Sequence, residues 1–345
     1  MSKKILHIAG CDKFIPPFID FVKENFDCSE HEFLLTSGMA EKKLNFTPKV
    51  RLAKPSKLGK IKHYCQVVIK MHQADKVVLH SLFDHRIVKI LFFMPWLLKK
   101  CYWVMWGGDL YVYQFGERNR GWKRREFFRR PVIKHMGHLI TYIEGDVELA
   151  REWYGAKGQY HECIMYLSNV YNAPNIVEEK DNALNIQVGN SADPSNNHLE
   201  ALEKLLAYKD ENICIYVPLS YGDSKHAKKV IEQGKLWFGE KFIPLAAFMP
   251  TDEYLKFLGK IDIAVFNHKR QQAMGNTITL LGLGKTVYMR SDVSQWQFFK
   301  DREIVVFDID NLNILEKRSI KENLNKVKSY FSKENLKSQY IEIFK

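Results

Sequence analysis

The sequence lacks the features that mark several classes of protein. Its six cysteines (Cys11, Cys28, Cys65, Cys101, Cys163 and Cys214) are scattered singly with no CxxC pair. A disulfide framework and a structural zinc site are therefore not expected, and no other metal site is indicated. The longest apolar run, 90–98, is nine residues long and contains Pro95, whereas a membrane-spanning helix needs roughly 20. With 11 prolines and 19 glycines in 345 residues, a collagen-like or low-complexity chain is also excluded.

Acidic residues are in deficit. The 52 Lys and Arg outnumber the 40 Asp and Glu, which gives a formal net charge of +12. Such a balance favours a polyanionic partner, namely nucleic acid, an anionic membrane surface or a phosphorylated substrate. The first apolar run is only as long as a strand, so no secretory signal is expected and the unpaired thiols predict a cytosolic chain.

Short apolar runs alternate with longer amphipathic stretches, which is typical of a parallel α/β sheet. In the first half, strands are expected at 4–9, 32–35, 76–80, 101–105 and 139–143, and helices at 17–25, 59–73 and 84–99. In the second half, strands are expected at 186–188, 213–217, 242–245, 261–266 and 286–289, with helices at 198–207, 224–232, 251–258 and 277–283.

The alternation is interrupted once, by a polar stretch rich in asparagine and acidic residues. We therefore expect a Rossmann-like domain at 1–170, a linker at 171–185, a second Rossmann-like domain at 186–311 and a C-terminal helical segment at 312–345. The predicted fold class is α/β and GT-B-like, with two Rossmann-type domains facing a cleft and the C-terminal helix packing back.

Ligands of open α/β sheets bind at the carboxyl ends of strands, so the strand ends are searched for polar groups. The motif Trp106-Gly107-Gly108-Asp109 follows one strand of the first half. Asp109 is interpreted as a general base or a hydroxyl-orienting carboxylate, with helix capping as the alternative. His80 ends another strand and is a second acid–base candidate, whereas His7 lies inside a strand and is interpreted as a core residue.

Two loops in the second half are candidates for an anion site. Gly189, Asn190 and Ser191 follow the first strand and lead toward a helix, where free N–H groups favour phosphate. The segment 270–277 contains Arg270, Gln271, Gln272, Gly275, Asn276 and Thr277. Arg270 is predicted to contact a diphosphate and Tyr221 to form an aromatic wall for a nucleobase. An ordinary capped loop is the alternative.

The segment 117–135 is strongly basic and aromatic. It carries eight Lys and Arg against two acidic residues, with Trp122, Phe127 and Phe128 interleaved. An anionic membrane surface is the favoured partner. A solvated helix face and a nucleic-acid patch are the alternatives, although no RNP, KH, helix-turn-helix or zinc signature accompanies the segment.

Several of these motifs together resemble glycosyltransferase family 56. They are WGGD at 106–109, the Gly-Asp pair at 145–146, VGNSAD with His198, VP with Tyr221, RQQ with Gly275, and the segment around Met289 to Trp296. The Glu-x7-Glu signature of many retaining GT-B enzymes is absent from 267–285.

The resemblance implies transfer of a 4-acetamido-4,6-dideoxygalactose or fucose-like sugar from a dTDP-sugar to a polyprenyl-diphosphate-linked glycan, as in assembly of the enterobacterial common antigen. It further implies peripheral binding at the cytoplasmic face of the inner membrane and no metal or cofactor beyond the nucleotide-sugar. Gly189, Asn190, Ser191, Tyr221, Arg270, Gln271, Gln272, Gly275, Asn276 and Thr277 would hold a dTDP- or UDP-sugar. Domain 186–311 would thus be the nucleotide-sugar-binding domain. Domain 1–170 would be the acceptor- and membrane-facing domain, in which Asp109 and His80 would face the acceptor.

Three other functions remain open at this stage. A nucleotide-sugar 2-epimerase of the same architecture would need more carboxylates near the sugar and no acceptor. A basic nucleic-acid-binding protein would use segment 117–135. A non-catalytic scaffold that binds sugar nucleotides is the third alternative.

Overall fold

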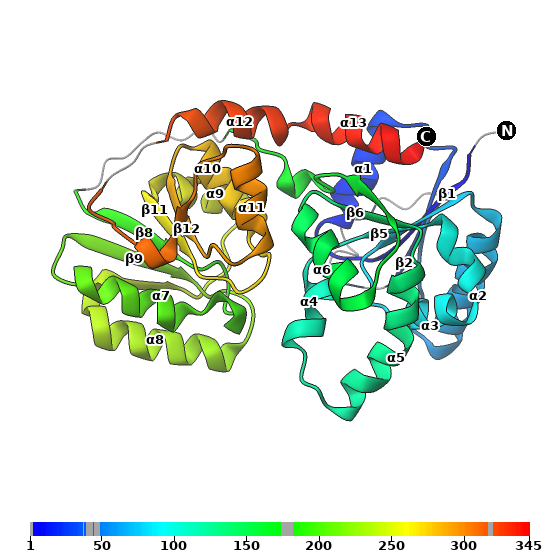
Figure 1. Ribbon diagram of the computed structural model, residues 1–345, viewed down its shortest axis with the longest axis horizontal. Coiled ribbons are helices and arrows are strands. Elements are labelled where there is room, and N and C mark those ends of the chain that lie inside the picture. Colours follow the sequence, from blue (N-terminus) through cyan, green and yellow to red (C-terminus); the bar gives the residue numbers. More distant parts are fainter. Residues whose placement is uncertain (1–2, 37, 39–43, 45–48, 174–181, 317–319) are drawn as a thin grey trace. The chain divides into compact units, whose positions relative to one another are not determined.

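The structure is a computed structural model that describes residues 3–36, 38, 44, 49–173, 182–316 and 320–345. The chain divides into two compact units. Unit 1 comprises Met1–Ser168 and Lys333–Lys345, and unit 2 comprises Asn169–Ser332. The helices and strands of each unit can be followed in Figure 1.

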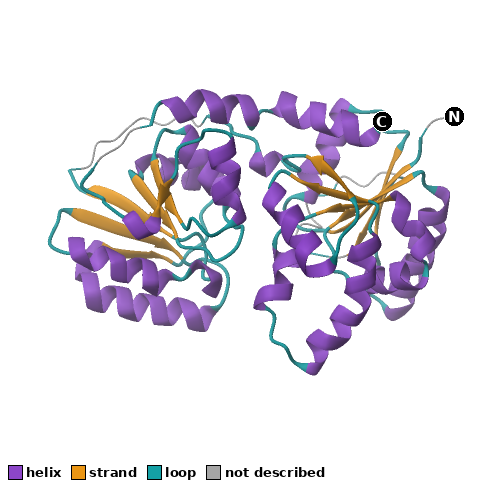
Figure 2. Ribbon diagram, viewed as in Figure 1, coloured by secondary structure: helices purple, strands orange, loops and turns teal. Residues whose placement is uncertain are grey.

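The described part of unit 1 is built on a seven-stranded parallel sheet with helices on both faces (Figure 2). The strand order is β3-β2-β1-β4-β5-β6-β7. Its strands are β1 (Ile5–Gly10), β2 (His31–Thr36), β3 (Val50–Leu52), β4 (Lys76–His80), β5 (Cys101–Val104), β6 (His138–Thr141) and β7 (Gln159–Glu162). Its helices are α1 (Ile15–Asn25), α2 (Lys57–Gln73), α3 (His85–Phe93), α4 (Gly108–Phe115), α5 (Arg120–His135), α6 (Glu144–Tyr154) and α13 (Lys333–Phe344).

The described part of unit 2 repeats this arrangement on a smaller scale. Six parallel strands lie in the order β10-β9-β8-β11-β12-β13. They are β8 (Leu184–Val188), β9 (Ile213–Pro218), β10 (Phe242–Leu245), β11 (Ile263–Phe266), β12 (Thr286–Met289) and β13 (Phe307–Asp308). The helices are α7 (His198–Leu205), α8 (Ser224–Phe238), α9 (Thr251–Lys260), α10 (Met274–Gly282), α11 (Ser294–Asp301) and α12 (Glu322–Tyr330).

Burial explains why the central segments are strands. All four residues of β5, β11 and β12 are buried, because helices cover both faces of a parallel sheet and leave no polar side. The strand order reverses between β1 and β4 in unit 1 and between β8 and β11 in unit 2. Loops diverge at such a reversal and leave a crevice outside the carboxyl ends of the strands. Each unit therefore has one favoured place for a ligand.

The expected strands 76–80, 242–245 and 286–289 have the bounds that the structure shows. The expected helix 84–99 is wrong at its end, since α3 stops at Phe93 and a 3-10 turn covers Pro95–Lys100. Pro95 has no N–H to donate to a preceding turn, so the α-helix does not run through it. The stretch 174–181, within the expected linker, lies outside the described residues.

The expected C-terminal helical segment, 312–345, is divided in the structure. It forms two helices, α12 in unit 2 and α13 in unit 1. The break falls at Phe331 and Ser332, where Phe331 leaves helical geometry and is fully buried. Helix α13 packs back onto unit 1, where the Tyr340 hydroxyl donates to the Met165 carbonyl at 2.8 Å. Phe344 lies edge-on to His31, with 4.7 Å between ring centroids.

Among the described residues, the structure contains no helix long and apolar enough to cross a bilayer.

Replacement of Phe344 tests the attachment of α13 to unit 1. Because the Phe344 ring is 7% exposed and contacts His31, Phe26 and Tyr340, Phe344→Ala should lower the free energy of unfolding of unit 1 by about 3 kcal/mol. Ile341→Ala, on the same helix but 39% exposed, should change it by less than about 0.5 kcal/mol. Hydrogen exchange of the β1 amides in urea measures both variants. Equal effects would contradict this packing.

Candidate functional site

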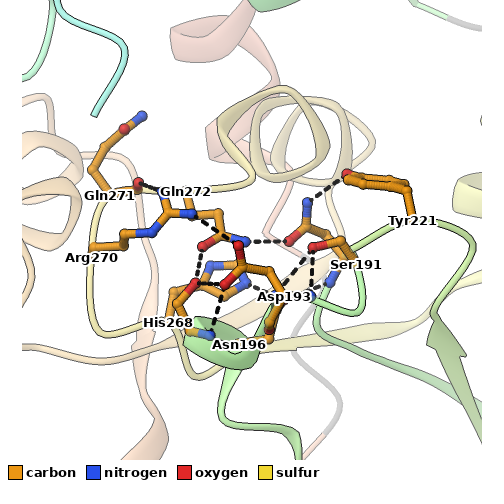
Figure 3. Close-up of polar contacts among 10 residues, drawn as sticks. Ser191, Asp193, Asn196, Tyr221, His268, Arg270, Gln271 and Gln272 are labelled. Carbon is orange, nitrogen blue, oxygen red and sulfur yellow. Dashed lines mark hydrogen bonds and ion pairs between the residues drawn. The ribbon is translucent and has the colours of Figure 1, made fainter. Parts of the chain in front are cut away.

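The crevice of unit 2 holds a connected set of polar side chains, here called the polar cluster: Asn190, Ser191, Asp193, Ser195, Asn196, Tyr221, His268, Arg270 and Gln272. They come from the loops that follow β8, β9 and β11, and Figure 3 shows their contacts. Side-chain hydrogen bonds connect the three loops. Gln272 Nε2 donates to Asn190 Oδ1 at 3.2 Å, and Asn190 Nδ2 donates to the Tyr221 hydroxyl at 3.2 Å. The two anion-site loops expected from the sequence thus meet.

Arg270 faces an acidic partner inside the polar cluster. Its Nη2 lies 3.6 Å from Asp193 Oδ2, and its Nη1 donates to the Gln271 carbonyl at 3.2 Å. Burial tends to raise the pKa of Asp193, but hydrogen bonds from Ser195 and the charge of Arg270 outweigh it, so the pKa is lowered. Asp193 is therefore ionised at neutral pH and holds the guanidinium over the crevice.

Asn196 fixes the turn after β8. Its Oδ1 accepts from the Asn190 N–H at 2.9 Å and lies 2.8 Å from His268 Nε2, while its Nδ2 donates to the Asp193 carbonyl at 2.9 Å. Gly189 has a φ of +67°, and a Cβ there would lie 2.6 Å from His198 Nε2. The turn therefore requires glycine at this position.

Two buried histidines, His268 of the polar cluster and the neighbouring His198, are neutral. Burial, with the charge of Arg270 next, lowers the pKa of His268 to about 3. Burial and the proximity of His226 lower the pKa of His198 to about 3. Since both rings are uncharged near pH 7, Arg270 is the cation of the polar cluster at neutral pH.

Four other expected donor-site residues have different outcomes. Helix α10 begins at Met274 rather than at 277, so Gly275 and Asn276 lie in its first turn, where N–H groups lack helical partners. Thr277 is fully buried and its hydroxyl donates to the Ala273 carbonyl at 3.1 Å. The expected ligand contact from this hydroxyl is wrong, because it has no exposed surface. The Gln271 side chain points away from the polar cluster (Figure 3).

The crevice of unit 1 is a pocket of about 440 Å³ at the ends of β1 and β4. Its walls are partly aromatic, with Tyr64, Phe83 and Trp106, and its cations are Lys60 and Arg86. Phe83 is 53% exposed, so an apolar ring faces solvent here. Aromatic faces of this kind pack against sugar rings and alkyl chains, while the cations suit an anionic group.

Two carboxylates line this pocket, and they differ in the hydrogen bonds that they accept. Asp84 caps α3, accepting from the Arg86 N–H at 2.9 Å and from the Tyr64 hydroxyl at 2.6 Å. Asp12 accepts from the Phe14 N–H at 2.8 Å through Oδ1. Burial raises the pKa of Asp12, although the Phe14 hydrogen bond and Lys13 oppose the shift. Because Asp84 accepts hydrogen bonds through both oxygens and the bond to Asp12 uses Oδ1, Asp12 is the candidate proton acceptor of this pocket.

The expected role of Asp109 as a base in contact with the acceptor is wrong. Its side chain is fully buried and its oxygens accept three hydrogen bonds. Oδ2 accepts from the Leu82 N–H at 2.9 Å and from Trp103 Nε1 at 2.7 Å, and Oδ1 accepts from the Trp106 N–H at 2.9 Å. Asp109 instead positions the loops after β4 and β5, which form part of the pocket wall.

His80 is one ring in a buried chain of hydrogen bonds. Trp106 Nε1 donates to the Tyr166 hydroxyl at 3.0 Å, which lies 2.6 Å from His80 Nδ1. His80 Nε2 is 3.1 Å from His7 Nδ1, and His7 Nε2 is 3.0 Å from His31 Nδ1.

The first member of this chain has a fixed direction. An indole N–H can only donate, so Tyr166 accepts from Trp106. Burial lowers the pKa of His80 to about 3, so the expected role of His80 as an acid or base near neutral pH is wrong. His7 is a core residue, as expected.

Sequence reasoning missed Asp12, Asp193, Asn196 and His268. Asp12 and His268 each stand two residues beyond a strand, so the strand-end rule that selected Asp109 and Asn190 applies to them equally. Asp193 and Asn196 lie within the quoted VGNSAD stretch and its continuation, but their hydrogen-bond partners are set by the turn geometry.

Comparison with known proteins now bears on this arrangement. The family model described as 4-alpha-L-fucosyltransferase glycosyl transferase group 56 matches residues 9–343. The chain belongs to glycosyltransferase family 56. The match spans both units, so the polar cluster and the pocket of unit 1 are parts of a family 56 glycosyltransferase.

Solved structures establish the fold of this family 56 chain as GT-B. Anabaena HepE in complex with UDP and glucose is 12% identical with a TM-score of 0.70, covering 99% of each chain. WaaG, a glycosyltransferase involved in lipopolysaccharide biosynthesis, is 13% identical with a TM-score of 0.61, covering 99% of this chain and 98% of its own. A Rickettsia africae glycosyltransferase is 12% identical with a TM-score of 0.62 and the same coverage.

Acid should destabilise unit 1 through His80. In the unfolded chain, His80 binds a proton below about pH 6.5, whereas in the folded chain the buried ring binds one only below about pH 3. The free energy of unfolding therefore falls as the pH falls. Between about pH 7.5 and pH 5.5 the His80 contribution is roughly 1.4 kcal/mol. His80→Gln should remove that contribution while lowering stability at pH 7.5, as measured by urea unfolding. An unchanged pH slope would contradict the neutral, buried ring.

Proposed function

We propose that this family 56 glycosyltransferase moves a deoxyamino, fucose-like sugar from a dTDP- or UDP-sugar to a polyprenyl-diphosphate-linked glycan. Unit 2 binds the donor and unit 1 binds the acceptor. The enzyme works as a peripheral protein at the cytoplasmic face of the inner membrane, without a metal ion. The family supports sugar transfer, and the geometry of each unit supports the assignment of substrates.

The observation that carries the donor assignment is the position of Arg270. It lies at the reversal of strand order in unit 2, within the polar cluster and just before the N-terminus of α10. A diphosphate there would meet the guanidinium and the free N–H groups of Gly275 and Asn276. HepE, whose fold this chain shares, is described in complexes with UDP and with UDP-glucose.

Catalysis by this site is electrostatic on the donor side. When the bond between the anomeric carbon and the diphosphate oxygen breaks, negative charge grows on the leaving nucleoside diphosphate. Arg270 and the first turn of α10 stabilise that charge without reorganisation, because Asp193 already holds the guanidinium in place. Tyr221, which is 54% exposed, provides a ring on which a nucleobase can stack.

Asp12 serves as the general base on the acceptor side. The acceptor hydroxyl gives its proton to the Asp12 carboxylate as its oxygen bonds to the anomeric carbon. The raised pKa of Asp12 brings its basicity closer to neutral pH. Lys60 and Arg86 bind the diphosphate of the lipid-linked acceptor, and Phe83 and Trp106 contact its sugars.

Replacement of Arg270 tests the donor site. Arg270→Ala should lower sugar transfer about a hundredfold, because one donor to the developing charge is lost. It should also abolish the thermal stabilisation by dTDP or UDP. Lys269→Ala is the matched control, since Lys269 is an adjacent, exposed cation that lies 3.9 Å from Glu200. Mass-detected transfer and a thermal-shift screen against dTDP, UDP, GDP and ADP measure these effects. Unchanged donor affinity in Arg270→Ala would refute the assignment.

Replacement of Asp12 tests the base. Asp12→Asn should lower kcat by a factor of roughly 100 or more while KM for the donor stays constant. Asp84→Asn is the control, because Asp84 lines the same pocket but is committed to Tyr64 and the α3 N-terminus. If both variants lose equal activity, the pocket binds the acceptor but Asp12 is not the base.

A further inference from the structure

Helices α3 and α5 lie side by side in unit 1 (Figure 1) and bring four phenylalanine rings together. Phe92 and Phe93 end α3, and Phe127 and Phe128 lie in α5. Phe92 is 5.0 Å from Phe128 and 5.5 Å from Phe127 between ring centroids. Phe93 is 66% exposed and Phe127 is 63% exposed. Two large apolar side chains thus face solvent from a rigid aromatic base.

A small pocket of about 120 Å³ adjoins these rings. Val88 and Phe128 form its apolar part, and His85, Lys89, Arg124 and Arg125 line the rest. Lys89 Nζ lies 5.3 Å from the centre of the Phe128 ring. Three permanent cations therefore converge on one cavity beside the exposed phenylalanines.

These cations have no acidic counterpart. Of the residues that the structure describes, no carboxylate forms an ion pair with Lys89, Arg124 or Arg125. The acidic residue within α5, Glu126, is buried and bonded at 3.1 Å to Arg129. The pKa of His85 is lowered by burial and then by the charges of Arg125 and Arg129. The pocket is thus an electropositive site without an internal anion.

We propose that His85, Lys89, Phe92, Phe93, Arg124, Arg125, Phe127 and Phe128, here called the α3–α5 face, dock on an anionic lipid bilayer. A phospholipid headgroup phosphate occupies the basic pocket, while Phe93 and Phe127 insert among the acyl chains. The proposal extends the proposed function, in which the acceptor is carried by a membrane lipid. The exposed phenyl rings favour a bilayer over nucleic acid, because they cannot hydrogen-bond to phosphates or base edges and gain by leaving water.

Vesicle sedimentation of the full chain, without donor or acceptor, tests this inference. Vesicles of phosphatidylcholine with about 30% phosphatidylglycerol should bind the protein, and vesicles of phosphatidylcholine alone should bind it much more weakly. The double variant Arg124→Glu/Arg125→Glu should reduce the partition coefficient at least about tenfold. Phe93→Ser/Phe127→Ser should reduce vesicle binding at low salt. It should also reduce the vesicle binding that remains at high salt, because salt screens the charges and leaves the apolar contribution.

Matched controls come from α8 in unit 2. Lys228→Glu/Lys229→Glu makes the same change in net charge on an exposed helix, and Leu236→Ser removes an apolar side chain that is 77% exposed. Both controls should bind vesicles as the unaltered chain does. If Lys228→Glu/Lys229→Glu loses as much binding as Arg124→Glu/Arg125→Glu, net charge alone sets the attraction and the proposal is wrong. An equal loss in Leu236→Ser and in Phe93→Ser/Phe127→Ser would likewise contradict it.

Two further measurements separate the outcomes. Binding of duplex DNA or RNA that is lost in Arg124→Glu/Arg125→Glu, without vesicle binding by the unaltered chain, would assign the face to nucleic acid and overturn the proposal. Thermal stabilisation by dTDP or UDP should be equal in all these variants, which shows that they fold. Vesicle binding without any sugar transfer would reject the proposed function alone, and transfer without vesicle binding would reject the docking face alone.

Discussion

Unit 1 depends on one buried carboxylate. Asp109 is fully enclosed and accepts three N–H groups, one from the loop after β4, one from the indole of Trp103 in β5, and one from the loop after β5. Arg129 of α5 donates to the carbonyls of Leu82 and Asp109 at 3.2 Å and 2.5 Å. A buried charge is tolerated only when its hydrogen-bonding capacity is met in this way. The same few bonds therefore shape the pocket of unit 1 and anchor the basic helix α5.

The requirement in unit 2 is different, since the proposed anion site must be rigid and yet accessible. The polar cluster is assembled before any ligand arrives, with Asn196 bridging the turn and Gln272 joining two loops. Asp193 balances Arg270 but is itself ionised and partly exposed. Under the proposed function, a diphosphate would compete well for the guanidinium, because it carries more charge than one carboxylate. Preorganised charge of this kind costs little at the moment of reaction.

The sequence predicted the fold well because alternation of apolar runs is a local signal. The expected strand 76–80 has the same bounds as β4. The rule that ligands lie at strand ends selects both Asn190 and Arg270. The rule does not distinguish a side chain that enters the crevice from one that turns into the core. Asp109 and Asp12 follow strands in similar contexts, and only three-dimensional packing shows that the first is enclosed and the second lines a pocket. The neutrality of His80 likewise depends on its burial, and its hydrogen-bond partner Tyr166 is 86 residues away in the chain.

The path of the chain through the two units imposes an order on biosynthesis. Unit 1 is completed by α13, whose Tyr340 and Phe344 fill its core, yet α13 follows the whole of unit 2 in the chain. On the ribosome, the strands of unit 1 emerge first, but the apolar surface around β1 and α1 stays uncovered until unit 2 has been made. The part of the molecule that is synthesised first is thus completed last.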